Sequence, residues 1–233
     1  MNAIITGASK GIGKTIAEKL VTQNCNIAIC ARDENQLQQT KLELQKINSN
    51  VTIFTMVADL SKKEDAQLFG KKCVEHFSTI DILVNNAGAY LPGDITTEAD
   101  GTIEKMIETN LYSAYHLTRV IAPKMQSQKS GHIFNMSSVA GLQAYKNGGA
   151  YSISKFALQG FSKNLREELK PFFVKVTTIN PGATMSDSWS GSGIDENRIM
   201  KATDIAEVLW NAYQLSHQTV VEDIVLRPIF GDL

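Results

Sequence analysis

Short apolar runs alternate along the chain with longer stretches in which apolar residues recur every three or four positions. The short runs have the length of buried strands, and the longer stretches have the spacing of helices with one buried face. The predicted strands are Asn2–Thr6, Asn26–Ala31, Val51–Ala58, Asp81–Asn85, His132–Met136, Val174–Asn180 and Val220–Leu226. The predicted helices are Ile12–Thr22, Glu34–Ile47, Lys63–Phe77, Gly101–Met125, Ala150–Lys170 and Thr203–Ser216.

This regular alternation predicts an α/β fold, with a doubly wound parallel sheet of about seven strands and helices on both faces. No stretch rich in proline, glycine or charge divides the chain. We therefore expect residues 1–233 to form a single domain, as α/β chains of this length often do.

Composition narrows the classes of partner. The chain has 23 basic and 24 acidic residues, which gives a formal net charge of −1 at pH 7. A chain without a positive excess is not expected to bind nucleic acid or an anionic membrane surface. No apolar run approaches the length of a membrane-spanning helix, and the first strand begins at Asn2 with no signal sequence before it. A soluble, cytoplasmic protein is expected.

Cysteines and histidines give no sign of a disulfide framework or a metal site. Cys25, Cys30 and Cys73 are odd in number and form no C-x-x-C pair, which indicates reduced thiols in a reducing compartment. The four histidines stand far apart and lack the spacing of metal ligands, so no metal is predicted.

A glycine cluster follows the first strand, in the stretch TGASKGIGKTIAEKL at residues 6–20. Gly7, Gly11 and Gly13 have the spacing G-x-x-x-G-x-G at the start of a predicted helix. Glycine allows positive φ and close approach, and a helix N-terminus with free N–H groups suits a phosphate. A tight strand–helix connection that binds no ligand explains the same glycines, so the cluster alone does not decide between them.

The second strand points to a particular nucleotide. Dinucleotide-binding folds often have an acidic residue about 20 residues after the glycines, which bonds the ribose 2′-hydroxyl. Here the strand ends at Ala31 without an acid, Arg32 follows it, and Lys10 lies within the glycine turn. Two cations near the ribose favour a 2′-phosphate, and hence NADP(H) over NAD(H). The alternative is that Arg32 and Lys10 are ordinary surface charges.

Several motifs together resemble the short-chain dehydrogenase/reductase family. They are TGASKGIG (6–13), NNAG (85–88), Asn110, Ser138, YSISK (151–155) and NPG (180–182). They span essentially the whole chain in the family's order and spacing. The resemblance implies a Rossmann-type fold and an NADP(H)-dependent oxidoreductase that transfers hydride between nicotinamide and a carbonyl or alcohol substrate. A non-catalytic NADP(H)-binding sensor is the alternative, although the four catalytic positions are all present.

Tyr151 and Lys155 are four residues apart on a predicted helix, so they share one face, where an ammonium would lower the pKa of a phenol. The resemblance implies that Tyr151 exchanges the substrate proton and that Lys155 also bonds the nicotinamide ribose. It implies that Ser138, thirteen residues before Tyr151, steadies the substrate oxygen and that Asn110 holds a proton-relaying water. The simpler alternatives are a half-buried tyrosine, a solvated lysine, a strand-end cap at Ser138 or Ser137, and a solvent-facing asparagine.

The resemblance also implies the cofactor site. In it, Asp59 would bond the adenine amine, although Asp59 could instead cap the next helix, and Pro181, Gly182 and Thr184 would lie against the nicotinamide carboxamide. The predicted cofactor-binding residues are Gly7, Ser9, Lys10, Gly11, Ile12, Gly13, Arg32, Asp59, Leu60, Asn86, Ala87, Gly88, Tyr151, Lys155, Pro181, Gly182 and Thr184.

The expected substrate pocket is mostly apolar or aromatic. Its predicted lining is Tyr90, Leu142, Tyr145, Met185 and Trp189. Because this set contains no cationic clamp for a carboxylate, a neutral or 3-oxoacyl-type carbonyl compound is favoured. Residues 186–193 form a polar stretch that would be either a mobile lid or a plain surface loop. Family members commonly form homodimers or homotetramers, and the same is expected here.

Overall fold

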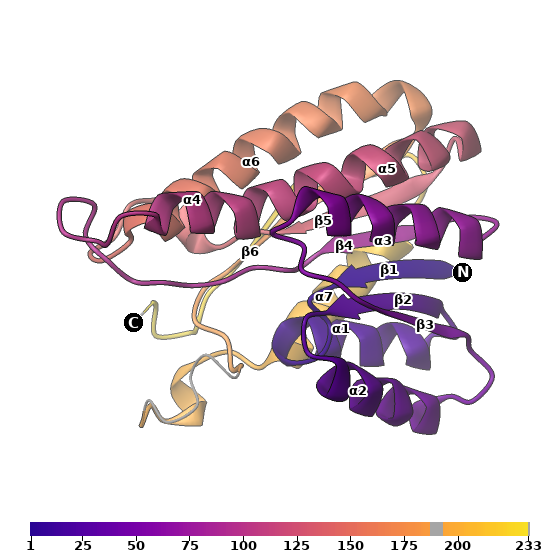
Figure 1. Ribbon diagram of the computed structural model, residues 1–233, viewed down its shortest axis with the longest axis horizontal. Coiled ribbons are helices and arrows are strands. Elements are labelled where there is room, and N and C mark those ends of the chain that lie inside the picture. Colours follow the sequence, from indigo (N-terminus) through magenta and orange to yellow (C-terminus); the bar gives the residue numbers. More distant parts are fainter. Residues whose placement is uncertain (187–192, 233) are drawn as a thin grey trace.

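One parallel sheet organises the protein. The computed structural model describes residues 1–186 and 193–232, and within them seven strands form a single sheet in the order β3-β2-β1-β4-β5-β6-β7 (Figure 1). The strands are β1 (Asn2–Thr6), β2 (Asn26–Ala31), β3 (Ile53–Val57), β4 (Ile82–Asn85), β5 (Gly131–Met136), β6 (Val174–Pro181) and β7 (Asp223–Leu226). The predicted α/β fold is confirmed.

The strand order reverses between β1 and β4. The chain runs outward from β1 through β2 to β3, then returns to place β4 on the other side of β1. In an open parallel sheet, such a reversal leaves a crevice at the carboxyl ends of the strands, where ligands bind. The glycine turn follows β1 and the NNAG turn follows β4, so both lie at this crevice.

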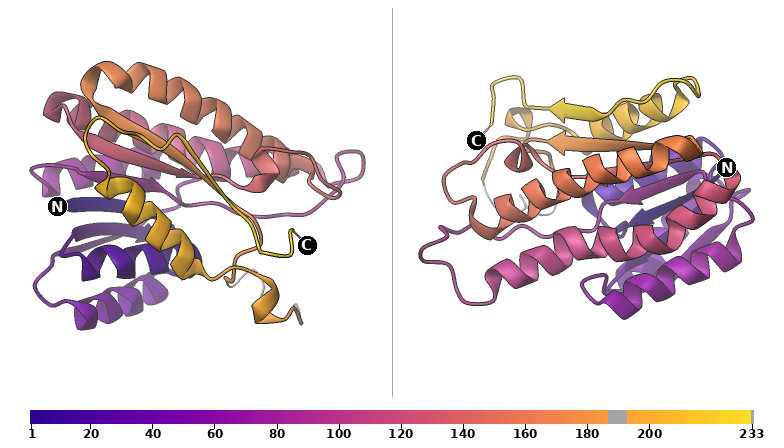
Figure 2. Two further views of the ribbon diagram at one scale, coloured as in Figure 1. Left: turned by 180° about the vertical axis from the view of Figure 1, so that it is seen from behind. Right: turned by 90° about the horizontal axis from the view of Figure 1, so that it is seen from above.

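Helices cover both faces of the sheet. One face carries α1, α2 and α7, and the other carries α3 to α6 (Figures 1 and 2). The helices are α1 (Gly11–Thr22), α2 (Glu34–Ile47), α3 (Lys63–His76), α4 (Thr102–Ile107), α5 (Ser113–Gln128), α6 (Gly149–Leu169) and α7 (Ala202–Gln214). Shorter turns are the π-helical η1 (Glu108–Tyr112) and the 3₁₀ turns η2 (Val139–Gly141), η3 (Lys170–Phe172) and η5 (Glu196–Arg198).

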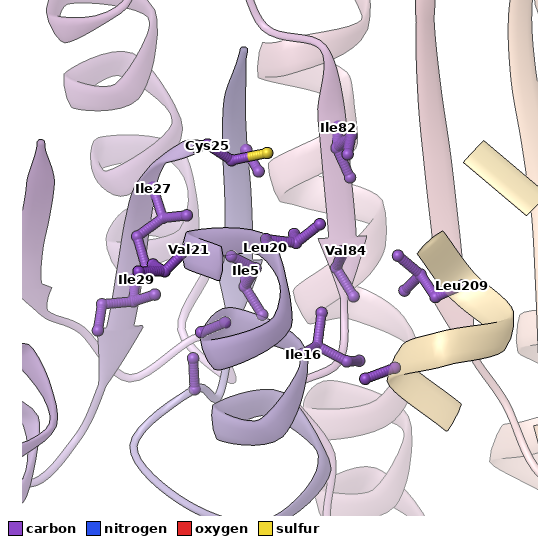
Figure 3. Packing of buried hydrophobic residues seen from close by; sticks show 14 of the residues in the cluster. Ile5, Ile16, Leu20, Val21, Cys25, Ile27, Ile29, Ile82, Val84 and Leu209 are labelled. Carbon is purple, nitrogen blue, oxygen red and sulfur yellow. The ribbon is translucent and has the colours of Figure 1, made fainter. Parts of the chain in front are cut away.

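Alternate strand residues supply the two halves of the core. Ile5 in β1 faces α1, where it packs in one buried cluster with Ile16 and Leu20 (Figure 3). Its neighbour Ile4 belongs to the cluster on the opposite face, together with Phe69 of α3. Burial on both faces explains why β1, β2 and β4 are nearly continuous apolar runs, since each of their residues meets a helix layer on one side or the other.

Several predicted bounds differ from the structure by one or two residues, and three predicted elements differ in an instructive way. The predicted strand Val51–Ala58 is shorter, because β3 pairs with β2 only over Ile53–Val57. Likewise, β7 pairs with β6 only from Asp223 onward. The predicted helix Gly101–Met125 is three elements, α4, η1 and α5, with a π-helical turn in the middle. In the described part of the chain, no helix has the length and apolar character needed to cross a bilayer.

Candidate active site

Two adjoining cavities occupy the crevice at the carboxyl ends of the strands. The smaller, about 290 Å³, lies against the glycine turn, and the larger, about 440 Å³, lies between β4, β5, β6 and the start of α6. Both have the size of ordinary ligand pockets. They share four lining residues, which are Ile12, Asn86, Gly88 and Ser186. The crevice is therefore one extended site with two ends.

The glycine turn is shaped first by protein contacts. Gly7 and Gly11 have φ of +62° and +55°, which an L-residue with a side chain rarely adopts. A Cβ on Gly13 would overlap the Asn86 side-chain nitrogen and the Gly7 carbonyl oxygen. The space at Gly13 is thus taken by the NNAG turn and by Gly7, as expected of a tight strand–helix connection. Gly11 lines the smaller cavity.

The NNAG turn is fastened to the end of β1. The Thr6 hydroxyl accepts hydrogen bonds from the backbone N–H groups of Asn86 (2.9 Å) and Ala87 (2.8 Å). The Asn86 side chain in turn donates to the carbonyl oxygens of Thr6 and Gly7. Asn85 points into the core instead, where its amide donates to Asn135. Of the two asparagines, Asn86 is the one at the crevice.

The smaller cavity gathers the predicted cofactor residues from the first half of the chain. Arg32 and Asp59 lie at its lining, and the helix α1 begins there with Lys10 as an N-cap residue whose side chain does not cap it. Asp59 also accepts hydrogen bonds from the backbone and hydroxyl of Ser61, so it caps the local turn as well. The predicted residues that line this cavity are Gly7, Ser9, Lys10, Gly11, Ile12, Gly13, Arg32, Asp59, Leu60, Asn86, Ala87 and Gly88.

The larger cavity gathers the predicted residues from the second half of the chain. Ser138 stands just beyond β5, and Tyr151 and Lys155 lie on the first turns of α6. The loop between β6 and α7 supplies further lining residues. The predicted residues that line this cavity are Ser138, Tyr151, Lys155, Pro181, Gly182 and Thr184.

Burial decides the protonation of the Tyr151–Lys155 pair. The Lys155 Nζ lies 5.8 Å from the centre of the Tyr151 ring and donates a 2.8 Å hydrogen bond to the Met136 carbonyl oxygen. Burial lowers the pKa of Lys155 to about 8. Burial also raises the pKa of Tyr151, and a hydrogen bond with Ser138 offsets this only in part. The pKa of Tyr151 is therefore raised rather than lowered as expected, because desolvation of the phenolate outweighs the hydrogen bond with Ser138.

Ser138 has the capping role considered for it, and its role at the substrate oxygen stays a prediction. Its hydroxyl accepts a 3.1 Å hydrogen bond from the Ala140 backbone N–H and so caps η2. The same hydroxyl donates to the Pro181 carbonyl oxygen at 3.4 Å and hydrogen-bonds Tyr151. Ser137 also lines the cavity, but its hydroxyl is directed to the Lys155 backbone carbonyl. Ser138 is therefore the serine that contacts the phenol.

Asn110 is buried in the π-helical turn η1 and is only 1% exposed, so the alternative of a solvent-facing asparagine is wrong. Its amide accepts from the Ala89 N–H at 2.7 Å, donates to the Ala89 carbonyl at 3.0 Å and donates to the Ser154 hydroxyl at 2.9 Å. These bonds fix the backbone after NNAG against α6. Its oxygen lies 3.1 Å from where a Cβ on Gly88 would be, with the Lys155 Nζ 3.6 Å from the same point. The water relay remains a prediction.

The family follows from comparison with known proteins. Residues 1–197 match the family model described as short chain dehydrogenase. The chain belongs to the short-chain dehydrogenase family. An uncharacterized oxidoreductase of Staphylococcus saprophyticus is 33% identical to this short-chain dehydrogenase over 227 residues, covering 97% of each chain. A sepiapterin reductase of Chlorobaculum tepidum is 32% identical over 239 residues, covering 99% of this chain and 97% of the other.

A solved structure is similar in fold along the whole chain. The alcohol dehydrogenase of the archaeon Thermococcus sibiricus, complexed with 5-hydroxy-NADP, superposes with a TM-score of 0.91 at 28% identity. The match covers 100% of this short-chain dehydrogenase and 98% of the archaeal chain. Family membership and this fold make the protein an oxidoreductase of the short-chain dehydrogenase type.

The predicted substrate wall of this short-chain dehydrogenase is correct in part. Tyr90 and Tyr145 line the larger cavity, and the Tyr90 ring packs edge-on against the Tyr151 ring with 4.8 Å between the ring centres. Leu142 and Met185 are not among its lining residues. Trp189, and the proposed lid over residues 186–193 except for its ends, lie outside the described residues.

Sequence reasoning missed one wall of the larger cavity. Asp232, in the tail that follows β7, lines it. The predicted parallel sheet contained a signal for this tail, because a last strand parallel to its neighbours delivers the residues after it to the carboxyl edge of the sheet, where the crevice lies.

Proposed function

We propose that this short-chain dehydrogenase is an NADP(H)-dependent carbonyl reductase or alcohol dehydrogenase. The observation that carries the proposal is the convergence of Ser138, Tyr151 and Lys155 on one cavity, which adjoins a second cavity at the N-terminus of α1. An acid, a hydroxyl donor and an ammonium around one cavity are the groups that carbonyl reduction needs.

The crevice suits a dinucleotide. The smaller cavity borders the first turn of α1, whose N–H groups and dipole favour phosphate, and Gly11 adds no side chain there. The larger cavity has room for the nicotinamide and a substrate side by side. The residues that would hold the adenosine half are those around Arg32 and Asp59, and Pro181, Gly182 and Thr184 would hold the nicotinamide half. When bound, NADPH supplies a hydride to the carbonyl carbon.

The chain's own residues move the proton. Because burial raises the pKa of Tyr151, its phenol is protonated at neutral pH and is ready to give its proton to the carbonyl oxygen. Ser138, which hydrogen-bonds that phenol, donates to the same oxygen as negative charge develops. Lys155 favours the phenolate that remains. In the oxidation direction, the phenolate accepts the alcohol proton.

The preference for NADP(H) over NAD(H) rests on Arg32 and Lys10. Both line the smaller cavity, Arg32 directly after β2 and Lys10 in the glycine turn after β1, and the ribose 2′ position is expected at this cavity. The complex of the Thermococcus sibiricus alcohol dehydrogenase with 5-hydroxy-NADP supports the same choice. We expect Arg32→Ala to weaken NADPH binding about tenfold or more while leaving NADH binding nearly unchanged, since only NADPH carries the 2′-phosphate. Equal affinity of the unmutated protein for both cofactors would remove Arg32 from this role.

The substrate is proposed to be a carbonyl compound without a negative charge. The sepiapterin reductase of Chlorobaculum tepidum makes a pterin carbonyl one candidate, beside 3-oxoacyl compounds and simple ketones or aldehydes. Tyr90 and Tyr145 provide aromatic surface for any of these.

A carbonyl library screened by the loss of NADPH absorbance tests the function. We expect turnover with at least one compound and its abolition in Tyr151→Phe, with NADPH binding within about twofold of the unmutated protein. A Tyr213→Phe variant, which removes the hydroxyl of a tyrosine outside the cavities, serves as the matched control. Tight NADPH binding without turnover across the library would favour the sensor alternative instead.

We also propose a homodimer or homotetramer in the cytoplasm. Several large apolar side chains are exposed on η1, α5 and α6, namely Tyr112, Tyr115, Ile153 and Phe156, and they would be covered in an assembly. All three cysteines are buried and unpaired, which agrees with a reducing compartment. The mass in solution measured by light scattering tests the assembly.

A further inference from the structure

The tail after β7 is anchored at the mouth of the larger cavity. β7 is parallel to β6, so Arg227–Asp232 emerges at the carboxyl edge of the sheet, where the C-terminus lies in Figure 1. The tail turns back on itself through a 2.8 Å hydrogen bond from the Gly231 N–H to the Pro228 carbonyl. Arg198 then holds it from outside, donating to the Gly231 carbonyl at 2.9 Å and the Asp232 carbonyl at 3.1 Å.

This anchoring fixes the Asp232 carboxylate with its two oxygens in different surroundings. Oδ2 forms an ion pair with the Arg227 guanidinium. Oδ1 lies against Gly182, 2.5 Å from the point that a Cβ on that glycine would occupy. A side chain at position 182 would push the carboxylate away, so the glycine allows this approach.

A short series of contacts and hydrogen bonds links Asp232 to the reacting groups. Gly182 follows Pro181, whose carbonyl oxygen accepts the hydrogen bond from the Ser138 hydroxyl. Ser138 also bonds Tyr151, and all of these residues line the same cavity. A substrate whose carbonyl oxygen meets Ser138 and Tyr151 therefore has Asp232 within the same pocket.

The charged side chains that line the cavity differ in how accessible they are to a ligand. Among the described residues that line it, Lys155 and Asp232 are the only charged ones. Lys155 is 6% exposed and is bonded to the Met136 carbonyl, whereas the Asp232 side chain is 31% exposed. The more accessible charge is thus the negative one.

We propose that Asp232 selects the substrate: its Oδ1 accepts a hydrogen bond from an O–H or N–H group carried by the carbonyl compound, and its charge repels compounds that carry a carboxylate. This inference rests on the proposed carbonyl reductase function and gives it a substrate class, hydroxylated or amino-substituted carbonyl compounds. An acceptor in the pocket that a substrate leaves unpaired, or a like charge placed beside it, lowers the rate with that substrate.

The test uses meta- and para-substituted benzaldehydes that differ only in one group: hydroxymethyl, methyl or carboxylate. We expect kcat/KM to fall from hydroxymethyl to methyl to carboxylate, with at least a tenfold difference between the first and the last. Asp232→Asn should reduce that ratio about tenfold, because a neutral amide no longer repels the carboxylate. Asp223→Asn, the same change at an exposed position at the start of β7, should leave the ratio unchanged.

Arg227→Gln separates selection from support of the tail. It breaks the same ion pair as Asp232→Asn but leaves the carboxylate with its full charge. We expect the ratio to rise or stay the same in Arg227→Gln, whereas a purely structural role would lower it in both variants. Calorimetric binding of the corresponding benzyl alcohols to NADPH-loaded protein, where no turnover occurs, should show the same order as the rates.

The outcomes distinguish this inference from the proposed function. If no aldehyde is reduced and NADPH does not bind, the proposed function fails and the inference fails with it. If aldehydes are reduced but Asp232→Asn keeps the unmutated ratio, the inference alone is overturned. It is also overturned if Asp232→Asn weakens NADPH binding and leaves the ratio unchanged, since the carboxylate would then serve the cofactor.

Discussion

Lys155 should destabilise the folded protein at neutral pH, so replacing it should make the protein more stable as well as inactive. Burial lowers the pKa of Lys155 from 10.5 to about 8. One pKa unit corresponds to about 1.4 kcal/mol, so holding the ammonium charged in the folded state at pH 7 costs about 3 kcal/mol. Lys155→Met removes that cost, together with one hydrogen bond to the Met136 carbonyl worth about 1 kcal/mol. A net gain of about 2 kcal/mol is expected at pH 7.

The sign of the pH dependence makes this prediction specific. Between pH 8 and 10.5 the unfolded chain holds a proton on Lys155 that the folded protein has released, so the unmutated protein gains stability as pH rises. The stability gap between Lys155→Met and the unmutated protein should therefore shrink by about 2 kcal/mol from pH 7 to pH 9.5.

Urea unfolding at fixed protein concentration measures the gap at both pH values. Lys163→Met, at an exposed position on the same helix, is the control, and its gap should be the same at both. A Lys155→Met gap that stays constant from pH 7 to pH 9.5 would refute the reasoning, because it would mean that the ammonium is not desolvated in the folded protein.

Two further predictions concern the backbone around the site. Gly13→Ala should lower the free energy of unfolding, measured in urea, by about 1–3 kcal/mol, because the added Cβ would overlap the Gly7 carbonyl. The control Gly160→Ala, which has no described atom within 4 Å of its added Cβ, should be neutral or stabilising, and equal effects of the two changes would contradict the packing argument. Glu98 accepts a hydrogen bond from the Ala150 N–H at the start of α6, so Glu98→Ala should lower kcat severalfold while the NADPH affinity stays unchanged. Glu98→Gln should restore most of the lost kcat, and an effect on NADPH binding alone would exclude this positioning role.

Strand and helix positions followed from hydrophobic periodicity, because both faces of the central strands are buried and β1, β2 and β4 are nearly uninterrupted apolar runs. The starts of β3 and β7 did not, since apolar residues such as Val51 and Val220 precede the first paired position of each strand. The π-helical turn was also unpredictable, because periodicity does not register one extra residue in a helix. What explains that turn is the buried amide of Asn110, which binds a loop more than 20 residues earlier.

The site was predictable where the chain carries recognisable motifs and unpredictable where geometry decides. The glycine turn and the residues after β4 and β5 were located from sequence, and the structure gathers them at one crevice. The protonation state of Tyr151 could not be predicted, because spacing along a helix reveals which groups are near but not how deeply they are buried. Asp232 was missed although a parallel last strand delivers the tail to the edge of the crevice, because the sequence does not show which residue of the tail reaches the cavity.

The anchored tail has a practical consequence for anyone handling this protein. Asp232 lies at the rim of the larger cavity, whereas the first strand begins at the opposite edge of the sheet (Figure 1). An addition made close to Asp232 would adjoin Arg198 and the cavity mouth, whereas an addition made close to Asn2 would lie at the other edge of the sheet. Immobilisation or fusion should therefore be made through the amino-terminal end.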